Sequence, residues 1–512
     1  MKTIFRIIPT LFLSVGAMAQ NYNDAILFNQ CDYVGTARSQ AMGSAFGALG
    51  ADLTSQSINP AGLAAYRATE IGLSLGVNIN KTNSTYYGYK NNDDKISVPF
   101  NNIGVAFTFG NVMRENATGV LNHDFSISYS RLADYNRAVT YSDMYGRNSM
   151  LDYFCADNNI NDEQTYILAK NAGWIYDSFT DEDTGTQIDL KTNSWEQPYL
   201  ENDNAMLDIA ARVDNDGLGL VDHTQHVKEK GYKGETSFSY AMNISDKIYW
   251  GLSIGIQSLN YREKVNHYEQ YFGQPYEAAN DFTYTTTLRQ DGTGVNFKLG
   301  AIVKPINALR IGVAIHSPSF YKIDELYSST ILGASDDYTY NSKELENNYS
   351  YRVPGKVIGS LAGIISNFAI ISVDYEMSDY GKSKFKDSDG ESDRYFDDLT
   401  NQMKSTLKRV HTLRAGIEGR ILESLYLRAG YNMQTTPFKN RILVSSHKHN
   451  AITGGIGFRR NNFFFDAAYV YRVSNGDRWV LPDSEQYKYE TNVPATYKSK
   501  NHNIALTAGF RF

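Results

Sequence analysis

Hydrophobic and polar residues alternate at every second position in many segments of about ten residues, the length of a membrane-spanning β-strand. At the C-terminus, Ile504, Leu506 and Ala508 share one face with Phe510 and Phe512, while small and polar residues occupy the other. Because successive side chains of a strand point to opposite faces, this period predicts an all-β protein. Fourteen segments show the pattern: 70–79, 101–110, 123–131, 236–244, 248–258, 282–304, 309–316, 351–365, 368–377, 407–419, 425–433, 449–458, 463–472 and 502–512.

The connections between these segments alternate between short and long. Short ones fall at 245–247, 305–308, 366–367, 421–424 and 459–462. Long ones fall near 80–100, 132–235, 259–281, 317–350, 378–406, 434–448 and 473–501, and 111–122 is intermediate. Outer-membrane barrels have an even number of strands, short periplasmic turns and long outer loops. The sequence therefore predicts a 14-stranded antiparallel transmembrane β-barrel over residues 67–512, with apolar side chains facing lipid.

The longest expected loop, 136–233, contains 18 acidic and 8 basic residues, a net charge of −10. A charged segment of this size is costly inside a membrane and costs little in water. We therefore expect 136–233 to be extracellular.

The first nineteen residues have the features of a secretory signal. Lys2 and Arg6 precede the apolar stretch 7–15, and Ala17 and Ala19 form a small-residue cleavage site. A buried N-terminal helix is the alternative interpretation. We expect residues 1–19 to be a signal peptide and the processed chain to lie in the outer membrane of a Gram-negative type envelope. Export would permit a disulfide between Cys31 and Cys155, which the sequence does not decide.

Residues 20–66 are rich in Gly, Ala and Ser and lack a clean alternation. A barrel of about eight strands is filled by its own side chains, whereas 16–18 strands leave an aqueous channel. A fourteen-stranded lumen would leak if it were empty. We therefore expect residues 20–66 to form an N-terminal hatch (plug), in which Gly43 and Gly47 permit tight packing.

Composition and short motifs remove several classes of function. The net charge of −7 argues against a nucleic-acid partner. His223 and His226, like His447 and His449, have a spacing that could bind metal, but solvated loop histidines are the favoured interpretation. We find no nucleophile–base pair and no phosphate loop, so we expect neither an enzyme nor a cofactor; an outer-membrane hydrolase is unsupported.

The hatch segment carries a recognisable motif. Residues 35–43, 45–50 and 59–63, with Asn59, Pro60 and Ala61 as an NPA motif, resemble the FadL/TodX outer-membrane long-chain fatty-acid transporter family. The stretches 131–136 and 374–380 resemble the branch of that family often labelled haemin receptors. The resemblance extends over nearly the whole chain.

The resemblance implies passive transport of a hydrophobic, fatty-acid-like compound. Ligand would enter from the outer loops, occupy a luminal pocket, and leave sideways into membrane lipid at a kinked third strand after the hatch rearranges. The candidate lateral gap is Ser130, Arg131, Leu132, Ala133 and Asp134, where alternation fails. Apolar pockets avoid about 0.8 kcal/mol of hydration cost per CH₂.

Two alternative functions stay open. One is a haemin receptor, for which His447 and His449 are the first residues to test, and the other is a non-transporting scaffold for protein secretion. In either case, the terminal Phe510 and Phe512 are expected to form an assembly signal read by the barrel-assembly machinery.

Overall fold

The computed structural model describes residues 22–110, 118–146, 150, 178–180, 187–189, 220–272, 281–333, 339–366, 368–388, 394–439, 449–481 and 493–512. The expected signal peptide 1–19, together with Cys155, His447 and most of 147–219, lies outside the described residues.

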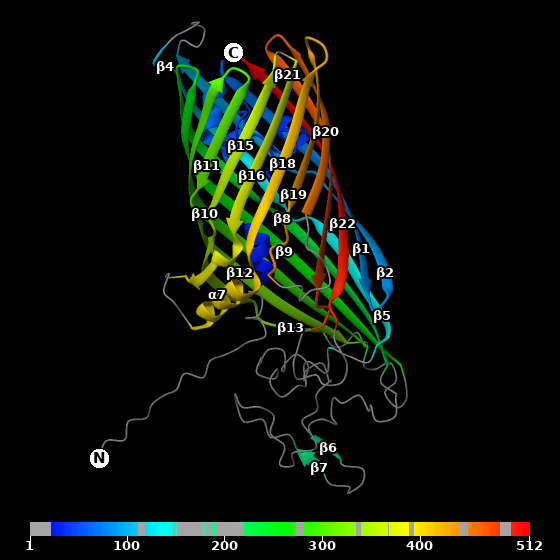
Figure 1. The fold of residues 1–512 in the computed structure, drawn as a ribbon. Helices are drawn as coiled ribbons and strands as arrows, with labels where there is room; N and C mark the ends of the chain where they lie inside the picture. Colours follow the sequence, from blue (N-terminus) through cyan, green and yellow to red (C-terminus); the bar gives the residue numbers. More distant parts are fainter. Residues whose placement is uncertain are drawn as a thin grey trace, which may run out of the picture.

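The described strands close into a barrel (Figure 1). Neighbouring strands pair antiparallel around one circuit of fourteen wall positions, and β1 pairs with β22 from Glu70 opposite Arg511 to Thr85 opposite Thr496. This closure confirms the predicted 14-stranded antiparallel barrel. In order around the wall the strands are β1 (Glu70–Tyr86), β3 (Phe100–Gly110), β4 (Val120–Asp134), β8 (Leu220–Ile244), β9 (Ile248–Phe272), β10 (Phe282–Ile306), β11 (Leu309–His316), β15 (Lys356–Ile365), β16 (Ala369–Asp379), β18 (Arg409–Arg420), β19 (Leu425–Gln434), β20 (His449–Arg460), β21 (Phe463–Arg478) and β22 (Ala495–Arg511).

Apolar side chains cover the outside of the barrel. On β1, Ile71 and Leu75 are each 46% exposed, whereas Ser74 and Asn78, on the opposite face, are 0% and 3% exposed. The same alternation of exposed and buried positions recurs along β10, β16 and β18. A water-soluble protein would bury these rows of Ile and Leu, so the arrangement is that of a transmembrane barrel.

The short connections gather at one end of the barrel, at the top of Figure 1. Ser245 and Asp246, between β8 and β9, have positive φ angles of 56°, and Ser366 and Asn461 have φ of 51° and 55° in their own turns. Such left-handed residues are typical of tight hairpins. The predicted short turns are confirmed at these positions.

Several predicted loops are wrong in part, because strands continue far beyond the apolar band. β8, β9 and β10 are 25 residues long, so β8 begins inside the expected loop 136–233. Outside the membrane both faces of a strand are polar, and the alternation that marks a strand disappears. Further elements within the expected loops are β2 (Tyr89–Ser97), β5 (Arg137–Gly146), β12 (Ser319–Gly333), β13 (Thr339–Asn341), β14 (Leu345–Val353), η3 (Tyr380–Lys382), β17 (Lys384–Asp387) and α7 (Arg394–Thr406), and the small hairpin β6 (Ser178–Thr180) and β7 (Gln187–Asp189).

Two wall positions are interrupted at the same level by proline. The predicted single strand 351–365 is two strands, β14 and β15, separated by Pro354 and Gly355. On the neighbouring wall position, Pro318 separates β11 from β12. The two wall positions pair on one side of the break through β11 and β15, up to His316 opposite Lys356, and on the other side through β12 and β14. Proline has no N–H to donate to a ladder, which explains both interruptions.

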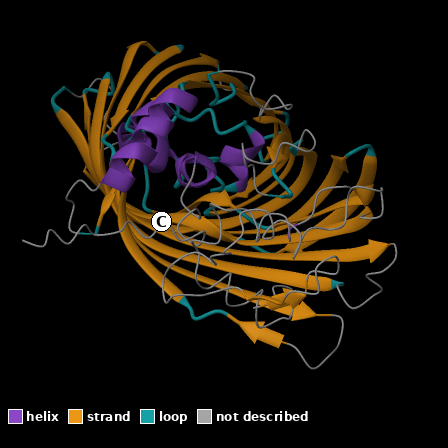
Figure 2. Cartoon of the chain, turned by 90° about the horizontal axis from the view of Figure 1, so that it is seen from below, coloured by secondary structure: helices purple, strands orange, loops and turns teal. Residues whose placement is uncertain are grey.

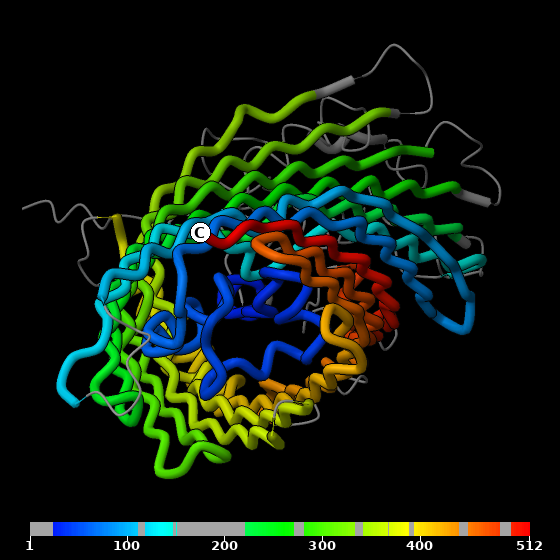
Figure 3. The backbone as a smooth tube through the Cα atoms, turned by 90° about the horizontal axis from the view of Figure 1, so that it is seen from above, coloured from blue at the N-terminus to red at the C-terminus, as the bar shows by residue number. Residues whose placement is uncertain are grey.

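Residues 22–66 lie inside the barrel and form the hatch (Figures 2 and 3). The hatch contains α1 (Tyr22–Asn29), α2 (Ala37–Ala41), α3 (Ser55–Ile58) and η2 (Pro60–Ala65). Nearly every residue from 33 to 64 is buried. Among the described residues, no helix has the length and apolar content required to cross a membrane.

Candidate functional site: the hatch, the lumen and the third wall strand

The NPA motif holds the hatch against the wall near the end with short turns. The Asn59 side chain accepts a hydrogen bond from the Ala61 N–H (3.1 Å) and so caps η2, while its Nδ2 donates to the Gly47 carbonyl (2.6 Å). Pro60 follows as the first helical residue, where its missing N–H costs nothing. The motif therefore ties two parts of the hatch together through one buried amide.

A glycine in the wall makes room for this motif. A Cβ at Gly300 of β10 would lie 1.9 Å from Asn59 Oδ1, so only glycine allows the observed contact. On another part of the wall, a Cβ at Gly416 of β18 would lie 2.4 Å from the Met42 carbonyl. Gly43 itself has a φ of 62° and sits against the backbone of Tyr431, which confirms the close packing expected at that residue.

Buried ion pairs connect the hatch to β18, β19 and β21. Arg38 of α2 donates to both carboxylate oxygens of Glu418, at 2.9 Å each. Arg428 bridges Glu418 (2.6 Å) and Asp466 (2.6 Å), and all four side chains are at most 11% exposed. Buried charges of this kind need their partners, so the network fixes the position of the hatch.

The candidate lateral gap lies where the third wall strand turns inward. Pairing between β3 and β4 ends at Asn102 opposite Ser130, and residues 130–133 are four consecutive buried positions. Arg131 forms a bridge with Val34 of the hatch, and the Leu132 carbonyl accepts from the Asp32 N–H (2.6 Å). The alternation thus fails where β4 stops pairing with β3 and contacts the hatch instead.

Polar side chains fill the space beside this inward turn. Arg131 donates to the Phe100 carbonyl (3.1 Å) and lies 3.3 Å from an oxygen of Asp134, which accepts from Asn78 of β1 (3.2 Å). Between β2 and β5, each described hydrogen bond uses at least one side chain, as where the Thr140 N–H and hydroxyl both donate to Asp93 (2.7 and 2.8 Å). Side-chain contacts break more readily than a backbone ladder.

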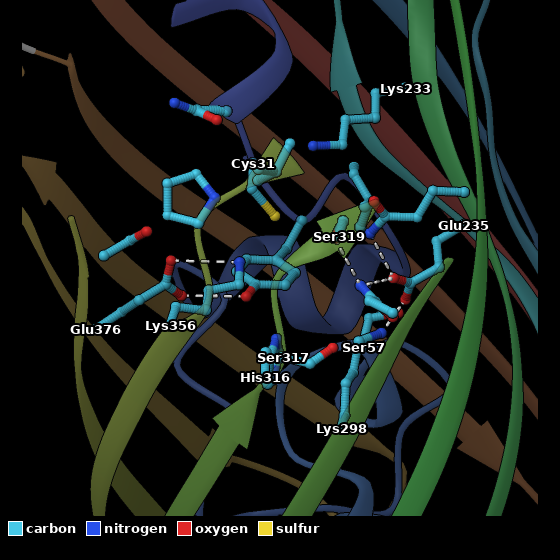
Figure 4. Close-up of a pocket in the computed structure, with 18 of the residues that line it drawn as sticks. Cys31, Ser57, Lys233, Glu235, Lys298, His316, Ser317, Ser319, Lys356 and Glu376 are labelled. Atoms are coloured by element: carbon cyan, nitrogen blue, oxygen red, sulfur yellow. Dashed lines mark hydrogen bonds and ion pairs between the residues drawn. The ribbon is translucent and has the colours of Figure 1, made fainter. Parts of the chain in front are cut away.

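A polar cavity of about 40 Å³ lies between the hatch and β8, β10 and β15 (Figure 4). Glu235 pairs with Lys298 and accepts from Gln257 (2.8 Å), and Glu376 lies 3.4 Å from Lys356. A water molecule needs roughly 10–15 Å³ of such space, so the cavity has room for a few waters and is too small for a lipid-sized molecule. The resemblance implies an apolar pocket, whereas this cavity is charged.

Lys233 is the distinctive cation of this cavity. Its side chain is buried, its Nζ donates to the Phe28 carbonyl of α1 (2.7 Å), and it lies 5.7 Å from the Tyr321 ring centre. Together Lys233, Lys298 and Lys356 outnumber Glu235 and Glu376 by one charge. Sequence reasoning missed these residues, although ionisable side chains within wall strands are a general signal of function.

An aromatic cluster adjoins the cavity on the side away from the short turns. It consists of Phe28 of α1, Tyr349 and Tyr351 of β14, Phe385 of β17 and Phe396 of α7. Phe28 meets Tyr351 edge-on with ring centres 5.1 Å apart, and Tyr351 lies 4.7 Å from Phe385. This cluster is a packed apolar core that sequence reasoning could not place, because α7 and β17 fall in an expected loop.

The histidine motifs are not brought together as pairs. His223 faces the lumen and is 2% exposed, whereas His226 is exposed on the opposite face. His447 lies outside the described residues, and His449 approaches Asp32 to 3.9 Å. Burial is the largest influence on the pKa of Asp32 and raises it, but Arg472 and His449 together hold the pKa below its usual value.

The last strand ends in an aromatic patch. Phe510 lies 4.6 Å from Phe463 and 4.9 Å from Phe512 between ring centres, and Phe512 is 69% exposed. The patch lies at the lipid-facing edge of β22 near the short-turn end. Its expected role as an assembly signal stays a prediction.

Solved structures resemble this chain over nearly its whole length. No family model and no curated protein matches it. A FadL homologue from Pseudomonas aeruginosa superimposes with a TM-score of 0.55 at 12% identity, covering 93% of this chain and 98% of that one. The toluene transporter TodX of P. putida gives a TM-score of 0.50 at 11% identity, covering 94% and 99%. The chain therefore has the fold of the FadL and TodX proteins, a fourteen-stranded transmembrane β-barrel closed by an N-terminal hatch.

Proposed function

We propose that this protein carries hydrophobic compounds across the outer membrane by passive diffusion. The observation that carries this proposal is the aromatic cluster enclosed inside a barrel whose lumen the hatch blocks. A closed lumen excludes a general aqueous pore, while enclosed aromatic rings offer a molecule with an apolar tail a site away from water. The similar structures are described as a toluene transporter and a FadL homologue, which agrees with this class of ligand.

The ligand proposed is a fatty-acid-like molecule with an ionised carboxylate. Its tail would take the place of the Phe28 ring against Tyr351 and Phe385, and its carboxylate would take the place of the Phe28 carbonyl at Lys233. A carboxylate would add a full opposite charge to the acceptor position that the neutral Phe28 carbonyl now holds at Lys233. An ion pair with the buried ammonium would therefore favour the ligand over the carbonyl.

Displacement of α1 supplies a route from binding to hatch movement. Phe28 lies only four residues before Asp32, whose backbone N–H bonds the third wall strand at Leu132. Moving α1 therefore pulls on the contact that closes the candidate gap. Ligand would then leave sideways between β2–β3 and β4–β5, passing Arg131 and Asp134 into membrane lipid, which spares the tail a passage through water.

Equilibrium binding of palmitate to purified, detergent-folded protein tests this proposal. Lys233→Gln is expected to weaken palmitate binding by about tenfold, from the loss of a hydrogen bond to a charged group. The affinity for an uncharged hydrocarbon of similar length is expected to change less than about twofold, because it makes no such bond. Lys230→Gln is the matched control, since Lys230 is exposed on the same strand. A folded wild-type protein that binds neither ligand would refute the proposal.

The alternatives predict different results in the same preparation. Saturable haemin binding that His449→Ala weakens would support the haemin hypothesis instead; His449 lies 3.9 Å from Asp32, which also pairs with Arg472. A secretion scaffold would bind no small molecule. It would instead co-purify with a protein partner, and its deletion would leave uptake unchanged. In all three cases, we propose that Phe510 and Phe512 direct folding by the barrel-assembly machinery and that the apolar wall contacts outer-membrane lipid.

A further inference from the structure

Three metal-binding side chains, His223, His267 and Glu269, meet on one part of the luminal face, and Asp143 lies beside them on the neighbouring strand. Register places Asp143 of β5 opposite His223 of β8, and His223 opposite Glu269 of β9. His267 lies two residues before Glu269 and therefore on the same face of β9. All four residues are at most 6% exposed.

The ligand atoms are close enough to share one ion. One nitrogen or oxygen from each of His223, His267 and Glu269 lies within 4.8 Å of the others. His267 Nε2 is 2.8 Å from Glu269 Oε1, and the two imidazole rings are 5.7 Å apart at 68° to each other. Zinc ligands at about 2.0–2.2 Å from a tetrahedral ion are separated by roughly 3.3 Å. The His267–Glu269 pair at 2.8 Å would therefore open slightly, and the wider separations, of at most 4.8 Å, would contract.

The donor types favour a transition metal over calcium or magnesium. Two imidazoles with one carboxylate are a common zinc set, whereas calcium and magnesium prefer oxygen ligands alone. Directly opposed side chains of an antiparallel pair have Cβ atoms about 4.5–5.5 Å apart, so Asp143 can supply a fourth oxygen or orient His223. Met150 N–H donates to Glu269 Oε1 (2.7 Å) and fixes the orientation of that carboxylate.

We propose that Asp143, His223, His267 and Glu269 form a binding site for a divalent zinc-type ion. The ion would join β5, β8 and β9 where these strands extend beyond the apolar band. It would also offset the cost of burying the carboxylate charges. The site is independent of the ligand proposed for the aromatic cluster.

Titration of tag-free, EDTA-treated, folded protein with ZnCl₂ by calorimetry tests the site, with Co²⁺ absorption as a second measurement. We expect saturation near one equivalent, and intense visible Co²⁺ bands of a four-coordinate site. His267→Ala is expected to abolish saturable binding, and Asp143→Asn to weaken it about 10–100-fold. His226→Ala, on the outer face of the same strand, is expected to bind as the wild type does.

Two results would overturn the proposal. One is a folded wild-type barrel that takes up no saturable Zn²⁺. The other is Zn²⁺ binding that His267→Ala and Glu269→Gln leave unchanged, which would place the ion elsewhere. The folding of each variant is checked first by gel electrophoresis, in which a folded barrel migrates differently before and after heating. Glu269→Gln is the conservative second variant, because its side chain keeps an acceptor for the Met150 N–H.

Discussion

Arg38 of the hatch and Glu418 of the wall strand β18 form a buried, two-pronged ion pair, with both N–O distances at 2.9 Å. The pair joins a helix near the N-terminus to a strand 380 residues away. Arg428 and Asp466 extend it, so that one carboxylate receives two guanidinium groups. The hatch is thus held by charge as well as by shape.

Removing this carboxylate charge should loosen the hatch. Glu418→Gln leaves Arg38 and Arg428 buried without a full countercharge. We expect this to lower the free energy of unfolding by about 3 kcal/mol or more. We expect a higher ion conductance in planar bilayers while the barrel stays folded. Glu423→Gln, in the exposed turn after β18, should conduct as the wild type does. Equal conductance for the two variants would contradict a role of the pair in closing the lumen.

Adding a side chain at Gly300 of β10 should displace the NPA motif. A Cβ at Gly300 would meet Asn59 Oδ1 at 1.9 Å, so Gly300→Ala must push the motif from the wall. Overpacking of this kind typically costs about 1–3 kcal/mol. Gly359→Ala is a matched control, because nothing lies within 4 Å of its Cβ position. We expect a lower melting temperature and faster protease cleavage in the hatch for Gly300→Ala alone.

Closing the candidate gap covalently should stop transport. The Asn78 and Asp134 side chains meet at 3.2 Å across the gap, so the thiols of Asn78→Cys with Asp134→Cys lie within reach of a short bis-thiosulfonate cross-linker when Cys31 and Cys155 are replaced by Ser. Palmitate uptake by cells should fall after cross-linking and recover with reductant, which cleaves the linker. The control pair Ser239→Cys and Ser253→Cys joins β8 to β9 away from the gap. Undiminished uptake through the cross-linked gap variant would exclude this exit.

The turn that receives the base of the hatch should make stability pH-dependent. Burial is the largest influence on the pKa of Asp246 and raises it, but hydrogen bonds from Lys304, Tyr249 and Arg67 outweigh it and lower the pKa to about 2. A lowered folded-state pKa contributes stability above the unfolded value of about 3.9. That stability disappears as pH falls toward 2.

The test compares melting temperatures of wild type and Asp246→Asn between pH 5 and pH 2. The extra stability of the wild type over Asp246→Asn should disappear over that range. It should amount to no more than about 1 kcal/mol, because Asp246 is a third exposed. A constant difference between the two proteins would show that Asp246 carries no such linkage.

The sequence predicted the wall because lipid imposes a strict pattern on it. Ile71, Leu73 and Leu75 must face hydrocarbon, and the residues between them must face the lumen, so period two persists through each crossing. The same pattern fails beyond the membrane, where the sequence predicts loops at the positions of β2, β5 and β12. Luminal partners such as Lys233 and Phe28 are 205 residues apart and meet only through the barrel's register, which no local pattern encodes.

Photo-crosslinking with a diazirine-bearing fatty acid, followed by peptide mapping, tests the central claim most directly. The account predicts labels on luminal residues of the aromatic cluster, such as Tyr351 and Phe385, and competition by unlabelled palmitate. Labels confined to lipid-facing residues such as Ile71 and Leu73, with no competition, would show that the barrel meets fatty acids only as membrane lipid and would contradict the account.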